Sequence, residues 1–167
     1  MIMDGNGRWA LSRGKRRIEG HKRGADVAEQ MVAFCSNNDI EYITLFAFST
    51  ENWQRSMDEV SYIMGLLRWF LRYKTRVFMK NSIRFRVIGE RNTIPEALLK
   101  QIERTEKKTA HFRKHNLTLA LSYGGRQEIV LAARAACEAV QKGKLIPDEL
   151  TVDTFSPFLM ASICIQS

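Results

Sequence analysis

The sequence lacks several features that define large classes of protein. It has no apolar run approaching the ~20 residues that span a bilayer, and no basic segment followed by an apolar run such as opens a signal peptide. Its three cysteines, Cys35, Cys137 and Cys164, are scattered without the spacing of metal ligands. We therefore expect no membrane-spanning helix, and we expect unpaired structural thiols in the reducing environment of the cytoplasm.

Acidic residues are also scarce. The 18 Asp and Glu residues stand against 26 Lys and Arg residues, which gives a formal net charge of +8 over 167 residues. A chain of this length fits one domain, and its positive charge suits an anionic partner. Nucleic acid, a phosphorylated metabolite and an anionic membrane surface all fit, and composition does not choose among them. Because no RNA-reading aromatic motif or helix-turn-helix pattern is visible, we expect no nucleic-acid partner.

Short apolar segments alternate with longer helical patterns along the chain. The expected strands are residues 1–4 (the end of a buried strand), 40–48, 83–88 and 117–121. The expected helices start at Arg8 and cover residues 20–37, 59–80 with Asp58 as N-cap, 95–115 with His111 and His115 exposed at its end, and 127–142. This alternation is typical of βαβ units, so we predict an α/β fold with a parallel β-sheet flanked by helices.

Three loops that follow expected strands carry the residues suited to chemistry. In the first, the glycines of Gly5-Asn6-Gly7 tolerate positive φ and expose backbone N–H groups, and Arg8 suits phosphate oxygens. The Asp4 carboxylate would repel an anion unless a divalent cation lay between them, so the loop predicts a metal–diphosphate site. A strand-ending turn with a solvated Arg8 is the alternative. The other loops, residues 49–55 and 122–126, should converge on the same edge, where parallel sheets bind ligands.

The expected helix over residues 59–80 carries apolar side chains over much more than one stripe. An amphipathic surface helix would show a cleaner polar face. Two interpretations remain open. The helix is buried on two sides, or one of its faces packs on the core while another lines an apolar cavity.

Five motifs, in order along the chain, resemble the cis-prenyltransferase family. They are Met3-Asp4-Gly5-Asn6-Gly7-Arg8-Trp9-Ala10, Gly20-His21, Leu45-Phe46-Ala47-Phe48-Ser49-Thr50-Glu51-Asn52-Trp53, Arg86-Val87-Ile88-Gly89 and Tyr123-Gly124-Gly125-Arg126. The resemblance implies a cis-prenyltransferase-like fold with a hydrophobic tunnel, usually in a homodimer. It implies an enzyme that condenses isopentenyl diphosphate onto an allylic diphosphate such as farnesyl diphosphate. The long-chain polyprenyl product would be a lipid carrier precursor for cell-wall glycan, with peripheral contact to the inner face of the membrane.

The same resemblance implies the site residues. Asp4 matches a catalytic carboxylate that binds Mg²⁺ on a substrate diphosphate, and Asn52 matches a position described as proton acceptor. The other implied substrate-binding positions are Gly5, Asn6, Gly7, Arg8, Trp9, Arg17, His21, Ser49, Thr50, Glu51, Trp53 and Arg55. Because a neutral amide is a very weak base, we expect Asn52 to orient its neighbours while the departing diphosphate takes the proton.

Several of these residues have structural alternatives. His21 could pair with a carboxylate at a helix start, Trp53 could serve packing, and residues 123–126 could be purely architectural. The chain also departs from the family, whose later motif of Arg, Ser and Glu supplies a second metal carboxylate and has no match here. We therefore expect residues 1–167 to form a single catalytic domain that is incomplete and trimmed at both ends. The alternative is a non-catalytic truncated or partner subunit that binds a prenyl diphosphate.

Overall fold

The computed structural model describes residues 1–164, with side chains to Ser162, and contains a three-stranded sheet. Its strands are β1 (Tyr42–Ser49), β2 (Ile83–Ile88) and β3 (His115–Tyr123), in the order β1-β3-β2 with both pairings parallel. Leu45 and Val87 flank Leu119 of the central strand from its two sides. The predicted α/β fold, a parallel sheet flanked by helices, is confirmed.

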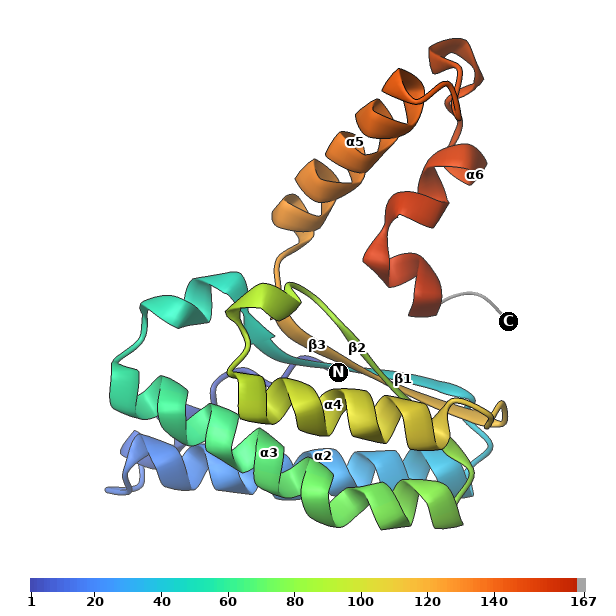
Figure 1. Cartoon of the computed structure of the whole chain (residues 1–167). Coiled ribbons are helices and arrows are strands. Elements are labelled where there is room, and N and C mark those ends of the chain that lie inside the picture. Colours follow the sequence, from blue (N-terminus) through green and yellow to red (C-terminus); the bar gives the residue numbers. More distant parts are fainter. Residues whose placement is uncertain (165–167) are drawn as a thin grey trace.

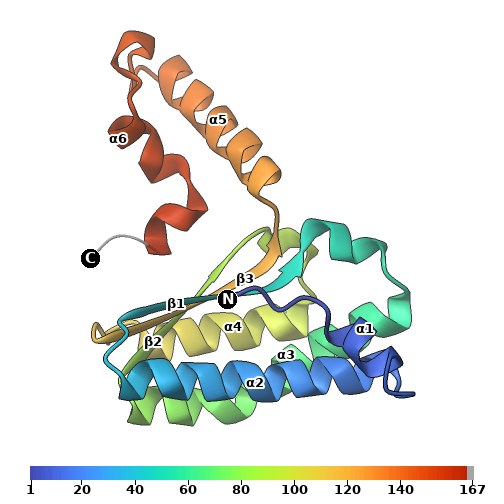
Figure 2. The same cartoon turned by 180° about the vertical axis from the view of Figure 1, so that it is seen from behind.

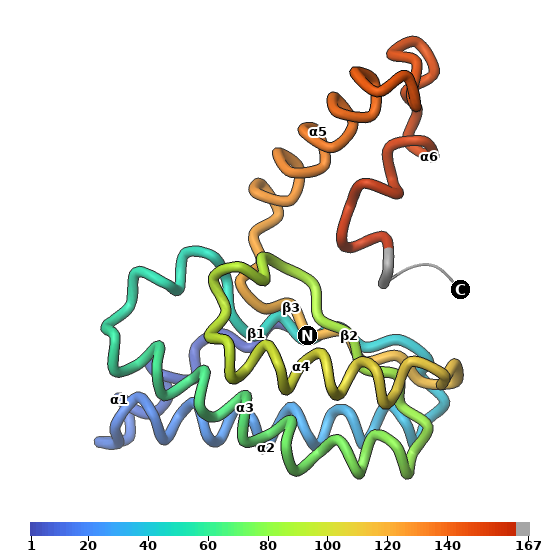
Figure 3. Tube along the Cα trace, viewed as in Figure 1, coloured from blue at the N-terminus to red at the C-terminus, as the bar shows by residue number. Residues whose placement is uncertain are grey.

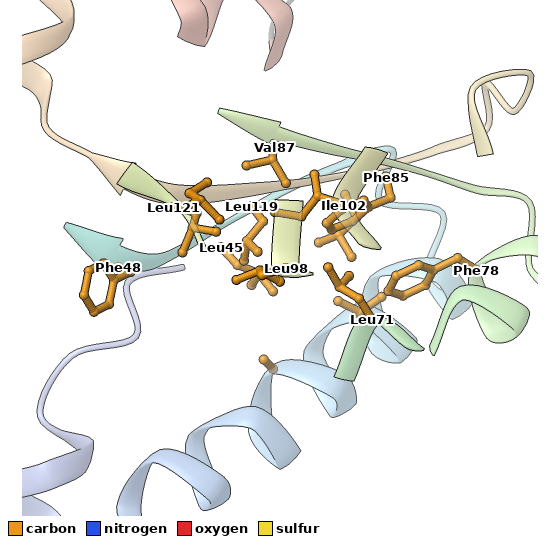
Figure 4. Packing of buried hydrophobic residues seen from close by; sticks show 14 of the residues in the cluster. Leu45, Phe48, Leu71, Phe78, Phe85, Val87, Leu98, Ile102, Leu119 and Leu121 are labelled. Carbon is orange, nitrogen blue, oxygen red and sulfur yellow. The ribbon is translucent and has the colours of Figure 1, made fainter. Parts of the chain in front are cut away.

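Three long helices cover one face of this sheet (Figures 1 and 2). They are α2 (Arg17–Asn37), α3 (Met57–Lys80) and α4 (Glu96–Thr109). Figure 4 shows the apolar side chains that meet between sheet and helices, which include Leu45, Phe85, Val87, Leu119 and Leu121 from the strands and Leu71, Phe78, Leu98 and Ile102 from the helices. Burial of these side chains is the main force that holds the layers together.

The first residues run beside β1 but are not the buried strand end that we expected. The Phe46 N–H donates to the Met1 carbonyl (2.9 Å), and the Met3 N–H donates to the Phe46 carbonyl (3.1 Å). Ile2 makes a single parallel bridge with Phe46 and is 76% exposed. The predicted burial was wrong because the segment lies at the outer edge of the sheet, beyond β1.

Local capping shifts the starts of three helices from their expected positions. Helix α1 (Asn6–Leu11) begins two residues before Arg8, directly after Gly5 at φ +80°. Helix α2 begins before Gly20 because the Glu19 carboxylate accepts a hydrogen bond from the Arg16 N–H (2.9 Å) and closes the first turn. In α3 the N-cap is Ser56, whose hydroxyl accepts from the Glu59 N–H, and the expectation for Asp58 was wrong.

The expected helix over residues 95–115 is shorter than its sequence pattern. Helix α4 follows Pro95 and ends at Thr109, and His115 begins β3 opposite Ile83. His111 is exposed as expected, whereas His115 is only 6% exposed. The prediction for His115 was wrong because no helix breaker precedes it in the sequence, and pairing with a distant strand decides its conformation.

The last helices form an arm that projects from the opposite side of the sheet (Figure 3). Helix α5 (Gly125–Gln141) leaves the end of β3, and α6 (Val152–Phe155) returns alongside it between short 3-10 helices at Pro147–Glu149, Ser156–Phe158 and Met160–Cys164. Two further 3-10 helices lie at Thr50–Gln54 and Arg91–Thr93. No helix in the described part of the chain is long and apolar enough to cross a membrane.

The two cysteines whose side chains are described are free, as the scattered spacing predicted. Cys35 is buried and Cys137 is exposed. The side chain of Cys164 lies outside the described residues.

Candidate functional site

One cavity of about 400 Å³ opens at the carboxyl ends of the strands, where the three loops converge as expected. Its mouth is polar and draws on all three loops and on α2. The polar and glycine residues that line it are Asp4, Asn6, His21, Ser49, Thr50, Glu51, Asn52, Arg55, Tyr123, Gly124 and Gly125. Its volume falls in the ordinary range for a small-molecule site.

The floor of the cavity is apolar and is built by α2, α3 and the sheet. Its side chains are Ala25, Ala28, Leu45, Phe46, Ala47, Ile63, Leu66, Leu67, Phe70, Leu71, Phe85, Leu117 and Leu119, with Ile2 and Met3 at the chain start. Helix α3 therefore has one face on the core and one on the cavity, while Trp69 and Tyr73 on its outer side are more than half exposed. This is the second of the two interpretations left open for that helix.

The first loop is positioned by close packing of α1 on α2. A Cβ at Gly20 would lie 1.9 Å from the Asn6 carbonyl oxygen, and one at Gly24 would lie 2.4 Å from the Asn6 side chain. Only glycine permits this approach, so the two helices fix Asn6 at the cavity mouth. Gly24, one turn after Gly20, could have indicated this close helix packing from the sequence, but we did not use it.

Asp4 and Arg8 lie at the outer rim of this loop. The Asp4 carboxylate accepts from the Gly5 N–H (2.6 Å) and lies 3.5 Å from the Arg8 guanidinium. Both side chains are more than 70% exposed, so both are accessible to a ligand. An ion pair this exposed contributes little to the stability of the fold. A ligand with a stronger charge can therefore readily take the place of either partner.

A carboxylate that we did not single out, Glu59 of α3, holds together two basic side chains that line the mouth and a third, Arg17, that lies beside it. It pairs with Arg17 (3.0 Å), His21 (2.8 Å) and Arg55 (3.0 Å), and its own side chain is 11% exposed. Burial alone would raise the pKa of Glu59, but hydrogen bonds from Arg17 and His21 and the charges of Arg17 and Arg55 outweigh burial and lower it. The structural alternative for His21, a pair with a carboxylate, is what the structure shows, although His21 also lines the cavity.

The second loop is ordered by its own hydrogen bonds. The Asn52 side-chain oxygen accepts from the Ser49 N–H (3.2 Å), so this amide holds the turn in place. Trp53 lies outside the cavity lining: its indole N–H donates to the Ser122 hydroxyl (2.9 Å), and its ring meets Phe48 edge-on at 5.0 Å. Gly124 lets the loop approach the end of β3, because a Cβ there would lie 2.7 Å from the Thr50 hydroxyl.

The structure thus divides the expected site residues into two groups. Those that line the cavity are Asp4, Asn6, His21, Ser49, Thr50, Glu51, Asn52 and Arg55, whereas Gly5, Gly7, Arg8, Trp9, Arg17 and Trp53 lie outside its lining. Arg17 remains close to the first loop, because a Cβ at Gly7 would lie 3.0 Å from its guanidinium.

The donor set at the mouth can be tested against the expected Mg²⁺. Among the described residues, no group of three or more His, Cys, Asp or Glu side chains could hold a metal ion. Mg²⁺ usually keeps several waters and is bound by one or two carboxylates together with substrate phosphates. The accessible Asp4 carboxylate fits such a shared ion, which a diphosphate would complete.

Comparison of the sequence with known proteins identifies one family of prenyltransferases. The sequence model of the prenyltransferase family described as undecaprenyl diphosphate synthase matches residues 2–165. An isoprenyl transferase of Neisseria meningitidis is 44% identical over 163 residues, which cover 96% of this chain and 62% of the relative. A ditrans,polycis-undecaprenyl-diphosphate synthase ((2E,6E)-farnesyl-diphosphate specific) of Salmonella typhimurium is 43% identical over 150 residues, or 90% of this chain and 60% of the relative.

A solved structure supports the same relationship. The lavandulyl diphosphate synthase of Lavandula x intermedia, in complex with dimethylallyl diphosphate, superposes with a TM-score of 0.93 at 34% identity. The match covers 97% of this chain and 70% of that structure. The chain spans 60% to 67% of the length of the curated relatives it matches.

Proposed function

The chain belongs to the undecaprenyl diphosphate synthase family of prenyltransferases, and we propose that it condenses isopentenyl diphosphate onto an allylic diphosphate such as farnesyl diphosphate. The observation that carries this proposal is the cavity, whose mouth is lined by polar and charged side chains of both signs while its floor is apolar. An allylic diphosphate has the same two parts. Its charged end would lie at the mouth beside Asp4 and His21, and its hydrocarbon chain would lie on the floor against α3.

The reaction needs the diphosphate to leave with its bonding electrons. The allylic carbon–oxygen bond breaks, a new carbon–carbon bond forms to the terminal alkene carbon of isopentenyl diphosphate, and a proton is lost. We assign Arg8, Arg17 and the N–H groups of the first loop to the charge that develops on the departing diphosphate. Mg²⁺ held by Asp4 would neutralise part of the same charge when it is bound.

The apolar floor has a separate role. The developing positive charge on the hydrocarbon chain reacts with water if water is present, so the chain needs a dry surround. Side chains of α3 such as Leu67 and Phe70 would provide that surround as the wall of a hydrophobic tunnel. Asn52 orients the second loop through its bond to Ser49, and the departing diphosphate takes the proton.

The remaining parts of the proposal concern the whole protein. We propose a single catalytic domain that acts as a homodimer in the cytoplasm and releases a long-chain polyprenyl diphosphate, a lipid carrier precursor for cell-wall glycan. Such a product implies peripheral contact with the inner face of the membrane. The substrate-binding set proposed from the family pattern also includes Gly5, Gly7, Trp9, Ser49, Thr50, Glu51, Trp53 and Arg55.

Replacement of Asp4 tests the assignment. We expect Asp4→Ala to lower the incorporation of radiolabelled isopentenyl diphosphate, with farnesyl diphosphate and Mg²⁺ present, by about 100-fold or more. The fold should survive, because the side chain is 72% exposed. Asp148→Ala, at an exposed aspartate of the arm, is the matched control and should leave turnover unchanged. Normal turnover in Asp4→Ala would contradict the assignment.

The same assay separates the enzyme from the non-catalytic alternative. A partner subunit would bind farnesyl diphosphate, measured by calorimetry, without transferring the radiolabelled isoprenyl group. Transfer by the unmodified chain would support the proposal that it is an enzyme. Binding without transfer would support the alternative of a non-catalytic partner subunit.

A further inference from the structure

The turn that follows α1 carries an exposed surface patch, which we call the basic–aromatic corner and define as Trp9, Leu11, Arg13 and Lys15. Leu11 is 54% exposed and Trp9 is 37% exposed, and both basic residues are exposed. Figures 1 and 2 show this dark-blue segment projecting past the ends of the long helices. The Trp9, Arg13 and Lys15 side chains lie together, and Leu11 is exposed at the end of the same short helix, two residues after Trp9.

The two basic groups are gathered over one aromatic ring. The Arg13 guanidinium carbon lies 4.7 Å from the centre of the Trp9 ring, and the Lys15 ammonium nitrogen lies 5.8 Å from it. Neither group has a carboxylate within ion-pairing distance among the described residues. The cation–π contacts hold the charges close to the indole without neutralising them.

The basic–aromatic corner is held in place by a buried residue and a backbone hydrogen bond. Ala10, between its two apolar residues, is fully buried, and the Lys15 N–H donates to the Ala10 carbonyl (3.0 Å). Gly14 makes the tight turn at φ +66°. The packing of α1 on α2 holds the backbone of the turn in place, so its side chains are presented at one site on the surface.

The chain connectivity places this corner beside the cavity. Asn6 precedes it and His21 follows it, and both line the cavity mouth. A flat surface bound at the corner would thus lie next to the opening through which a prenyl diphosphate would pass.

We propose that the basic–aromatic corner binds the surface of an anionic phospholipid bilayer. An exposed tryptophan and leucine suit the interface between headgroups and acyl chains, and unpaired Lys and Arg side chains are attracted by the negative headgroups. An aromatic ring with basic neighbours also suits single-stranded nucleic acid. The choice of a bilayer rests on the proposed function, because a polyprenyl diphosphate must enter a membrane, and on Leu11, which offers no stacking surface.

Sedimentation with lipid vesicles tests the proposal without any substrate. We expect the unmodified 167-residue chain to bind vesicles of phosphatidylglycerol and phosphatidylcholine, to bind pure phosphatidylcholine vesicles far less, and to be released by 0.5 M salt, a condition chosen to screen the charges. The double variant Arg13→Gln/Lys15→Gln should bind the anionic vesicles about 10- to 30-fold less tightly. Leu11→Gln should weaken binding about threefold.

Matched variants control for net charge and for exposed apolar surface. Lys107→Gln/Lys108→Gln removes two exposed charges from α4, and Leu150→Gln removes a leucine that is 47% exposed in the arm. Both controls should bind vesicles as the unmodified chain does. Equal losses in the controls and in the corner variants would overturn the proposal, because they would show that only total charge matters.

Two further outcomes of the binding measurements would count against the bilayer as the ligand of the corner. Failure of the unmodified chain to bind anionic vesicles, or corner-dependent binding of single-stranded RNA in its place, would also overturn the proposal. Vesicle binding is measured without isoprenyl transfer, so loss of transfer with vesicle binding intact would count against the proposed reaction alone.

Discussion

A single carboxylate links the two sides of the candidate mouth. Glu59 stands in the first turn of α3, and it pairs with Arg17 and His21 of α2 and with Arg55 of the second loop. The guanidinium groups of Arg17 and Arg55 would repel one another without it, and His21 would lose its hydrogen-bond partner. Because Glu59 is nearly buried, its negative charge is poorly solvated and depends on these partners for its stability.

The lowered pKa of Glu59 makes this contribution to stability depend on pH. Its ordinary value is 4.5, and the folded state lowers it, so the ionised form favours folding. The stabilisation should be fully present above about pH 4.5 and should be lost as pH falls through the lowered pKa. We expect Glu59→Gln to lower the free energy of unfolding by about 2 kcal/mol at pH 7, and by less at pH 3, which lies below the ordinary value and where part of the contribution of the ionised carboxyl is already lost.

Urea unfolding followed by circular dichroism at both pH values checks this expectation. Glu103→Gln, at an exposed carboxylate of α4, is the matched control and should change stability by less than about 0.5 kcal/mol at either pH. An effect of Glu59→Gln that is equal at pH 7 and pH 3 would show that lost packing is responsible rather than lost charge.

The same residue shows how far the sequence predicts the site. The loops that contain Ser49 and Gly124 could be predicted, because each follows a recognisable strand and parallel strands end at one edge. The loop at Asp4 lines the same cavity as expected, although the residues before it make only a single bridge with β1. The role of Glu59 could not, because its partners Arg17 and His21 lie 42 and 38 positions away along the chain. Only the packing of α2 against α3 brings them together.

At the scale of single elements, the start of α3 depends on a serine. The Ser56 hydroxyl accepts from the Glu59 N–H and satisfies one of the free donors of the first turn. We expect Ser56→Ala to cost about 1 kcal/mol of unfolding free energy. Asp58→Ala should cost no more than about 0.5 kcal/mol, because Asp58 lies inside the first turn, where an acidic side chain is stabilised by the helix dipole and does not act as the cap. Urea midpoints of the two variants compare them directly, and a larger loss for Asp58→Ala would restore it as the cap.

Elements with a strong local pattern were predicted well. Strand β2 covers the expected residues Ile83–Ile88, because Arg84 and Arg86 alternate with apolar residues and the pattern ends at Gly89, which has φ +119°. The boundary between α4 and β3 was predicted poorly, because residues 110–115 contain no glycine or proline that would mark the end of the helix. The pairing of His115 with Ile83 decides where β3 begins, and the local sequence does not predict a contact between residues so far apart.

At the scale of the whole molecule, the helices are distributed unevenly. Helices α2, α3 and α4 cover one face of the sheet, whereas α5 and α6 stand away from the other (Figures 1 and 3). The alternation of strands and helices predicted the parallel sheet, but it carries no information about which side each helix takes. Exposed Ile129 (59%) and Val130 (46%) on α5 show that the arm buries less of its apolar surface than the core helices do.

A buried carboxylate of the arm bonds both to the end of the central strand and to the last part of the arm. Glu128, 6% exposed, accepts hydrogen bonds from the Tyr123 hydroxyl at the end of β3 and from the Ala161 N–H (2.7 Å). The closest packing of α5 is against Ser156–Phe158 of the arm itself. A unit with few contacts to the main core is expected to open by itself, at a lower free energy than global unfolding.

Native-state hydrogen exchange measures that difference. We expect the amides of α5 to exchange about 100-fold faster or more than those of β3, which is paired on both sides and buried. Glu128→Gln should speed exchange in α5 about tenfold further and leave β3 unchanged, because one of the weakened hydrogen bonds joins α5 to Tyr123, the other joins it to Ala161 within the arm, and neither belongs to the pairing of the sheet. Glu138→Gln, at an exposed carboxylate of the same helix, should change neither. Equal exchange rates in α5 and β3 would instead mean that the arm and the sheet unfold as one cooperative unit, and Glu128 would then stabilise the whole molecule.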